Sequence, residues 1–228
     1  MPCGAVIPAA GSASRFGEGD KTLVGLAGRP VLEWVLQAML DSESLEQIVI
    51  VVSPSNQAEA MDLIVRMRSP VPISAVHGGE RRMDSVKEGV DALGQDIDMV
   101  LVHDAARPLV SPRLVRTVIE AACQYGAAIP GIPVTDTVKK TRGNQVVETL
   151  DRRELIAVQT PQVFRRDWLE AAYREIPVGT ELTDEASVLE AAGYPVRVVP
   201  GDPANLKVTT PMDTRIAEAM LYGREATA

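Results

Sequence analysis

Aromatic residues and cysteine are scarce in this chain of 228 residues. Phe, Trp and Tyr make up only 4% of it, so the core that its 46% hydrophobic content can build must be aliphatic. Cysteine occurs only at Cys3 and Cys123, which excludes a disulfide framework and a Cys/His metal cluster. We expect both to be buried or incidental free thiols in a reducing cytosol.

Basic residues are also in short supply. The chain has 23 Lys and Arg against 31 Asp and Glu, a net charge of -8 and a pI near 4.9. General nucleic-acid binding needs a basic face, so we expect no nucleic-acid partner. A few clustered cations can still bind an anionic small molecule, because local charge can override the global sign.

Long hydrophobic runs and targeting signals are missing as well. No apolar run approaches the ~18–20 residues that a membrane span needs. The N-terminus lacks the charged segment and the cleavage site of a signal peptide. We therefore expect a cytoplasmic protein without a membrane partner.

Apolar runs of strand length alternate with segments of helical spacing. Strands are expected at 5–7, 48–52, 73–76, 99–102, 127–133, 155–164 and 196–199. Helices are expected at 30–40, from Ser55 to about 67, from Asp84 or Ser85, from Ser111-Pro112 to 125, at 167–176, from Thr183 to Gly193 and from Thr210-Pro211. This βαβ spacing predicts an α/β fold with a mostly parallel sheet and helices on both faces. Because there is no linker or repeat, we predict one domain over residues 1–228.

The alternation breaks between Thr135 and Thr149. Two short segments, 138–140 and 146–147, flank Arg142-Gly143-Asn144, a pattern typical of a β-hairpin. The hairpin has too little apolar content to form its own core, so we predict a projecting arm at about 134–154. Such an arm can pack on a partner subunit or remain exposed to solvent, and the sequence leaves both open.

The stretch 5–21 combines a strand, a turn of small residues and two cations. Pro8 ends pairing in the buried strand, and the small residues 9–14 let a ligand approach the backbone. Arg15 and Lys21 follow, so the stretch favours a polyphosphate site. It contains neither GxxxxGK[ST] nor GxGxxG, which excludes the two commonest nucleotide loops. A small-residue turn that binds nothing special is the alternative.

Other polar clusters follow predicted strands, at the sheet edge where open α/β proteins bind ligands. Segment 77–86 carries two glycines, two arginines and a serine, and Asp104 is placed to contact a sugar hydroxyl or a metal. Taken singly, each cluster can equally consist of capping residues and solvated charges, and His103 is expected to be structural. Together, six cations are expected to converge on one face: Arg15, Lys21, Arg82, Arg107, Arg152 and Lys207. A cationic cleft in an acidic protein predicts a substrate with several phosphates.

These motifs resemble those of one known family. PAAGxxxR at 8–15, GGxxRxxSV at 78–86, VHDAARP at 102–108, DT at 136–137, DR at 151–152, TPQ at 160–162, TDEA at 183–186 and LKVT at 206–209 are collinear with its pattern. The family is that of the 2-C-methyl-D-erythritol 4-phosphate cytidylyltransferases. The resemblance covers nearly the whole chain. It implies a Rossmann-like, twisted sheet of the nucleotidyltransferase type and a homodimer formed through the β-arm.

The resemblance also implies an activity. CMP would be transferred from CTP to 2-C-methyl-D-erythritol 4-phosphate, a polyol phosphate, with release of pyrophosphate in non-mevalonate isoprenoid biosynthesis. The implied cofactor is Mg2+, bound mainly through the triphosphate, with no metal ligand assigned in the protein.

Individual residues acquire roles from the same resemblance. The implied catalytic residues are Arg15 and Lys21 at the α-phosphate, with Arg152 and Lys207 at the acceptor phosphate. Nucleotide binding is implied for Pro8, Ala9, Ala10, Gly11, Gly78, Arg82, Ser85, Asp104 and Ala105. Substrate binding is implied for Arg107, Thr137 and Thr160, and a neighbouring subunit can supply the first two.

The first loop departs from the family pattern at two points. Ala13 stands where glycine is usual, and Asp20 places a carboxylate beside the key Lys21. Two alternatives stay open. The first is a ribitol-5-phosphate cytidylyltransferase, whose motifs are similar. The second, more remote alternative is a nucleotide-binding protein without turnover.

Overall fold

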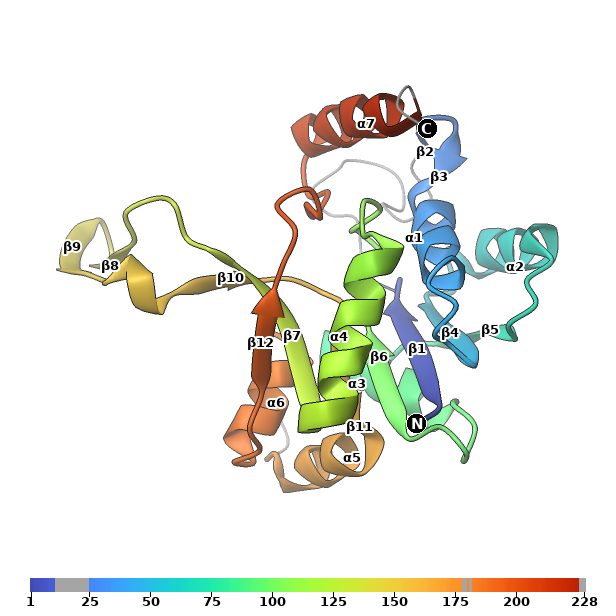
Figure 1. Cartoon of the computed structure of the whole chain (residues 1–228), viewed down its shortest axis with the longest axis horizontal. Helices are drawn as coiled ribbons and strands as arrows, with labels where there is room; N and C mark the ends of the chain where they lie inside the picture. The colour runs from blue at the N-terminus through green and yellow to red at the C-terminus, as the bar shows by residue number, and fades with distance from the viewer. Residues whose placement is uncertain (11–24, 178–179, 181, 226–228) are drawn as a thin grey trace.

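One eight-stranded sheet forms the centre of the protein (Figure 1). The computed structural model describes residues 1–10, 25–177, 180 and 182–225. The strands are β1 (Cys3–Pro8), β4 (Gln47–Val52), β5 (Ile73–His77), β6 (Met99–Val102), β7 (Ala127–Pro133), β10 (Ile156–Val158), β11 (Gln162–Arg165) and β12 (Arg197–Pro200). Their order is β10-β7-β11-β6-β1-β4-β5, with β12 also paired to β7.

Parallel pairing dominates this sheet. β1 pairs in parallel with β4 and β6, β4 with β5, and β12 with β7. β11 is the exception inside the sheet, because it runs antiparallel to both β6 and β7, and β10 is antiparallel to β7 at the edge. The predicted mostly parallel α/β sheet is confirmed.

Helices cover both faces of the sheet (Figure 1). On one face pack α1 (Val31–Leu40), α2 (Gln57–Met67) and α4 (Pro112–Tyr125), and on the other α3 (Arg82–Asp91), α5 (Arg166–Glu175) and α6 (Glu185–Ala191). A third, smaller core joins α7 (Pro211–Glu225) to β2 (Gly25–Leu26), which pairs with β3 (Arg29–Pro30). Among the described residues, none of these helices is both long and apolar enough to cross a membrane.

The central strand β1 shows why uninterrupted apolar runs become inner strands. Ala5 and Ile7 belong to the core on the α4 side, whereas Val6 belongs to the core on the α3 side. All three are fully buried. A strand whose two faces are both covered needs apolar side chains at every position, without the usual alternation.

The predicted strand 155–164 was wrong as a single element. It is divided into β10 and β11 by the residues around the cis Thr160–Pro161 peptide. Pro161 has no N–H to give to a ladder. The polar side chains before it bond inward: Gln159 Nε2 donates to the Asp202 carbonyl oxygen at 2.8 Å, and Thr160 is buried.

The cap of α4 is confirmed and that of α2 is corrected. Ser111 Oγ accepts the N–H of Leu114 at 3.2 Å, as the Ser-Pro pair predicts. α2 follows Asn56 instead of Ser55. The buried Asn56 amide donates to the Ala9 carbonyl oxygen at 2.9 Å, so tertiary contact with the first strand's end places this residue.

α3 and α6 also begin at other residues than predicted. α3 begins at Arg82, so Asp84 is its third residue and accepts the N–H of Arg81 at 3.2 Å in a capping box. α6 is capped by Asp184 instead of Thr183, and the Asp184 carboxylate accepts the N–H of the helix's third residue.

The predicted hairpin is present and extends away from the sheet (Figure 1). β8 (Lys139–Arg142) and β9 (Gln145–Thr149) pair antiparallel, and every residue in both strands is exposed. Val146 and Val147 are 61% and 56% exposed, which is unusual for adjacent valines in a strand.

Gly89 in α3 fits against β1 and β4 with no room for a side chain. A Cβ there would lie 2.4 Å from Val6 Cγ1 and 2.9 Å from Val51 Cγ2. Despite the better helix propensity of alanine, we expect Gly89→Ala to lower the free energy of unfolding by about 1–3 kcal/mol, measured by urea denaturation. Gly223→Ala in α7, where a Cβ meets nothing within 4 Å, is the matched control. Equal stability of the two variants would contradict the prediction.

Candidate active site

The carboxyl ends of β1, β4, β5 and β6 meet at one edge of the sheet, because these strands are parallel. Loops leaving this edge line two cavities, of about 440 Å³ and about 240 Å³. The predicted residues Pro8, Ala10 and Ser85 line the larger, Asp104, Arg107, Thr160 and Lys207 line the smaller, and Arg82 lines both. The structure thus brings most of the described candidate residues together at the predicted edge.

Close backbone packing forms the wall of the larger cavity. A Cβ on Gly78 would lie 2.6 Å from Ser85 Oγ and 2.9 Å from Ala10 Cβ, so only glycine fits there. The Ala9 N–H donates to the Val51 carbonyl oxygen at 2.7 Å, which fixes the end of β1 against β4. The small residues therefore let the end of β1 and the start of α3 approach each other closely.

Asp104, which lines the smaller cavity, is the centre of a group of ion pairs. Its Oδ2 lies 2.8 Å from Lys207 Nζ and 3.6 Å from Arg107 Nε, and its Oδ1 lies 3.5 Å from Arg82 Nη2. Burial alone would raise the pKa of Asp104, but Lys207 and Arg82 outweigh it and hold the pKa at about 2. The carboxylate is therefore ionised at neutral pH and anchors three cations, of which Arg107 is three residues away in sequence and Arg82 and Lys207 come from other parts of the chain.

Arg107 lies in its own chain's cavity. Its Nη1 donates to the Asn205 carbonyl oxygen at 2.8 Å, and Asn205 Nδ2 donates to the Thr160 carbonyl oxygen at 2.8 Å. Burial lowers the pKa of Arg107, and Asp104 opposes that shift. Within a single chain, the arginine already belongs to the site, so no partner is needed to supply it.

His103 and Thr160 hold the turn that carries Asp104. Thr160 Oγ1 accepts the N–H of Asp104 at 3.0 Å and lies 3.1 Å from His103 Nδ1, while His103 Nε2 lies 3.3 Å from the Arg107 carbonyl oxygen. A carbonyl only accepts, so Nε2 carries the hydrogen and Nδ1 accepts the Thr160 hydroxyl. Burial lowers the pKa of His103 to about 4, so the ring is neutral and structural, as the sequence predicts. The hydroxyl of Thr160, predicted to bind substrate, is used in this network.

The buried neutral ring predicts a pH effect on stability. Between pH 6.5 and about pH 4 the unfolded chain binds a proton at His103 that the folded chain excludes. The free energy of unfolding should therefore decrease as the pH is lowered across this window, by up to about 3 kcal/mol. The difference in unfolding free energy between pH 7 and pH 5 should be smaller in His103→Gln than in the wild type.

Two other buried titratable groups leave the comparison between the wild type and His103→Gln interpretable. The raised pKa of the buried Glu185 acts in the opposite direction but is common to both proteins, and the lowered pKa of Asp104 acts below pH 4. His77→Gln, at the exposed end of β5, makes the same substitution outside this network and is the matched control. An unchanged pH dependence in His103→Gln would contradict the assignment.

Glu185 is the functional candidate that sequence reasoning missed. It is the first residue of α6 and is 1% exposed. Arg82 Nη1 donates to both of its carboxylate oxygens, at 2.8 and 3.0 Å. Burial raises the pKa of Glu185, and Arg82 opposes that shift. The TDEA motif contains Glu185, but no local pattern indicates that a residue just after a helix cap will be buried with an arginine 103 positions away.

The remaining predicted residues lie elsewhere. Arg152 donates to the Thr135 carbonyl oxygen within the arm, and Thr137 is exposed in the same arm. Neither is among the described residues that line the two cavities. Ala105 is buried and is not among the residues that line either cavity. Gly11, Arg15 and Lys21, together with the departures at Ala13 and Asp20, lie outside the described residues.

The described residues do not fit a metal held by the protein itself. Among them, no group of three or more His, Cys, Asp and Glu side chains is arranged for a metal ion. Of the two aspartates that line the smaller cavity, Asp104 is already shared by three cations, and Asp184 accepts from Gln162 and from the Ser187 N–H, which makes both poor ligands for a divalent ion.

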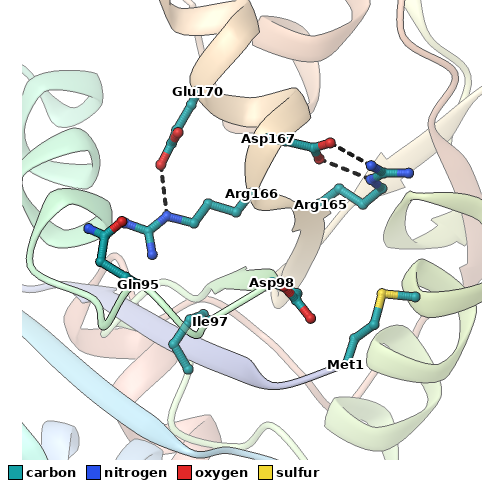
Figure 2. Close-up of a pocket in the computed structure, with 8 residues that line it drawn as sticks. All are labelled: Met1, Gln95, Ile97, Asp98, Arg165, Arg166, Asp167 and Glu170. Atoms are coloured by element: carbon teal, nitrogen blue, oxygen red, sulfur yellow. Dashed lines mark hydrogen bonds and ion pairs between the residues drawn. The ribbon is translucent and has the colours of Figure 1, made fainter.

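A larger hollow of about 510 Å³ lies at the opposite edge of the sheet, beside the start of α5 (Figure 2). Its arginines already have partners: Arg165 pairs with Asp167, and Arg166 Nε donates to Glu170 at 2.7 Å. Arg166 also donates to the carbonyl oxygen of Val90 in the last turn of α3 and to that of Gly94, three residues after the helix. The contacts of Arg166 hold α5 against the end of α3, so we assign this hollow to helix packing. We place the active site at the carboxyl edge instead.

Comparison with known proteins agrees with this geometry. The family model of 2-C-methyl-D-erythritol 4-phosphate cytidylyltransferase (IspD) matches residues 3–223. The enzyme of that name from Dehalococcoides mccartyi is 43% identical over 219 residues, covering 96% of this chain and 95% of the relative. The one from Pelotomaculum thermopropionicum is 42% identical over 225 residues, covering 97% and 94%.

Solved structures are similar over the same length. The 4-diphosphocytidyl-2C-methyl-D-erythritol synthase of Anaerococcus prevotii has a TM-score of 0.86 at 29% identity, covering 97% of this chain and 98% of the other. The 2-C-methyl-D-erythritol 4-phosphate cytidylyltransferase of Thermus thermophilus has a TM-score of 0.79 at 34% identity, covering 96% and 98%. The chain therefore belongs to the 2-C-methyl-D-erythritol 4-phosphate cytidylyltransferase family.

Proposed function

We propose that this protein transfers CMP from CTP to 2-C-methyl-D-erythritol 4-phosphate in non-mevalonate isoprenoid biosynthesis. Family membership and the two adjoining cavities support the proposal. The observation that carries it is the group of three cations, Arg82, Arg107 and Lys207, around Asp104 at the carboxyl edge. Such a group suits a reaction between two phosphorylated molecules, whose negative charges must be brought together.

The proposed reaction needs little acid–base chemistry from the protein. The acceptor phosphate is already ionised, so one of its oxygens attacks the α-phosphorus of CTP directly. The bond from that phosphorus to the oxygen bridging the β-phosphate breaks, and pyrophosphate leaves with the bond's electron pair. Positioning and cationic stabilisation of the in-line transition state supply the catalysis. Lys207 and Arg107 would hold the acceptor phosphate, and Arg82 would lie between the two substrates.

Mg2+ belongs to the proposal as part of the nucleotide. We expect it to arrive bound to the triphosphate, with water filling its remaining positions.

A homodimer formed through the arm is the second part of the proposal. The exposed Val146 and Val147 give the arm an apolar surface that a partner subunit can cover. Arg152 and Thr137 are carried on this arm, so docking could bring them to the partner's acceptor cavity. We further propose that residues 1–228 act as one domain with an arm at about 134–154, and that the enzyme is cytoplasmic.

Pyrophosphate release from CTP and Mg2+ tests the function, with 2-C-methyl-D-erythritol 4-phosphate and ribitol 5-phosphate as parallel acceptors. We expect release with the first acceptor only. Release with only the second would keep the chemistry and overturn the acceptor. CTP binding without release in either case would make the protein a nucleotide-binding protein without turnover.

A further inference from the structure

A buried carboxylate with a single arginine partner lies behind the two cavities. Glu185 is 1% exposed, and both of its oxygens accept from Arg82 Nη1. Isolating a carboxylate from water is costly, and an apolar residue would be the easier choice for stability alone. This costly pair fixes the position of the Arg82 guanidinium.

The helix start that carries Glu185 is itself held firmly. Asp184 caps α6, accepting the Ser187 N–H at 3.1 Å. Gln162 of β11 donates to Asp184 Oδ2 at 2.7 Å and accepts the Ala186 N–H at 3.3 Å. The TPQ and TDEA motifs therefore join at this point and fix Glu185 against the sheet.

Arg82 lies where the two cavities meet. It lines both of them, and its side chain is 33% exposed. Its Nη1 is held by Glu185 at 2.8 Å, whereas its Nη2 lies 3.5 Å from Asp104 Oδ1, a weaker contact. The guanidinium is thus held from behind, and its exposed part faces the cavities.

We infer that Glu185 is a positioning residue, which holds the Arg82 guanidinium at the junction of the nucleotide and acceptor cavities. Without it, Arg82 would turn toward Asp104 and compete there with Lys207 and Arg107. The inference rests on the proposed function, since it needs two substrates that meet beside Arg82. Glu185 itself touches neither cavity among the described lining residues.

Glu185→Gln tests the inference, because it keeps the side-chain size and removes the charge. We expect kcat/KM for pyrophosphate release to fall about tenfold or more, mainly through a higher KM for CTP. Glu190→Gln makes the same charge change on the exposed side of α6 and should retain wild-type kinetics. Wild-type kinetics in a folded Glu185→Gln protein would overturn the inference and leave the pair purely structural.

A coupling experiment separates positioning from general disturbance. If Glu185 acts through Arg82, Glu185→Gln should change kcat/KM less than about twofold in an Arg82→Ala background. The double variant should also be more stable than Arg82→Ala alone, because Arg82→Ala leaves the buried Glu185 carboxylate without its arginine partner. Additive losses of activity would overturn the inference.

Two further measurements keep the result interpretable. Should Glu185→Gln fail to fold, Arg82→Lys keeps a cation beside Glu185 but loses the planar fork, and we expect a similar loss of kcat/KM. Wild-type activity of Arg82→Lys would overturn the inference. CTP binding and turnover by the wild type are measured alongside, because their absence would refute the proposed function instead.

Discussion

Replacing Asp104 with asparagine is expected to lower kcat/KM for cytidylyl transfer by about a hundredfold or more. Asparagine has nearly the same size, but it cannot anchor Lys207, Arg107 and Arg82 through a shared negative charge. The three cations would repel one another and lose their alignment toward the substrates. Steady-state pyrophosphate release at saturating Mg2+ measures the effect. The pKa of Asp104 is about 2, so the carboxylate is ionised throughout the usual assay range.

The control for this variant is an aspartate in an ion pair outside the site. Asp91, at the end of α3, pairs with Lys87 at 2.9 Å, and both side chains are more than half exposed. Asp91→Asn should retain wild-type kinetics, since such surface pairs contribute little. If Asp104→Asn folded and kept kcat/KM within a few-fold of the wild type, the cation group would not be the centre of the reaction.

Mixing two inactive variants is expected to restore activity. Arg152→Ala and Lys207→Ala should each lower activity by about a hundredfold, because each removes a cation from the proposed acceptor site. If the arm of one subunit completes the site of the other, a mixed dimer contains one site with both cations intact. An equal mixture, allowed to exchange subunits, should recover about a quarter of wild-type activity, since half the dimers are mixed and half their sites are complete.

The arm offers its own control for this experiment. Arg153, next to Arg152, is 85% exposed and pairs with Asp151 within the arm. Arg153→Ala should be nearly fully active alone. No recovery in the Arg152→Ala and Lys207→Ala mixture, after subunit exchange has been verified, would mean that both cations serve the same chain's site or that the arm does not dock.

Both the success and the errors of sequence reasoning follow from the range of the interactions. The Ser111 cap was predictable because its hydroxyl bonds the N–H of Leu114, three residues later. The division of the predicted strand 155–164 was not, because it depends on contacts such as that of Gln159 with Asp202, 43 residues away. Asn56 likewise displaced Ser55 through a contact with Ala9, 47 residues away.

The sequence by itself determined the alternation of strands and helices, the hairpin, and the cationic loops at one edge. Those features depend on local periodicity, caps and turn residues, which act over a few positions. Only the tertiary structure decided that β11 runs antiparallel within the sheet, that Asp104 joins three cations, and that Glu185 holds Arg82. These pairings join residues up to 103 positions apart, and burial strengthens them by removing water. The charges and burial at one point are therefore set by the packing of all the elements that meet there.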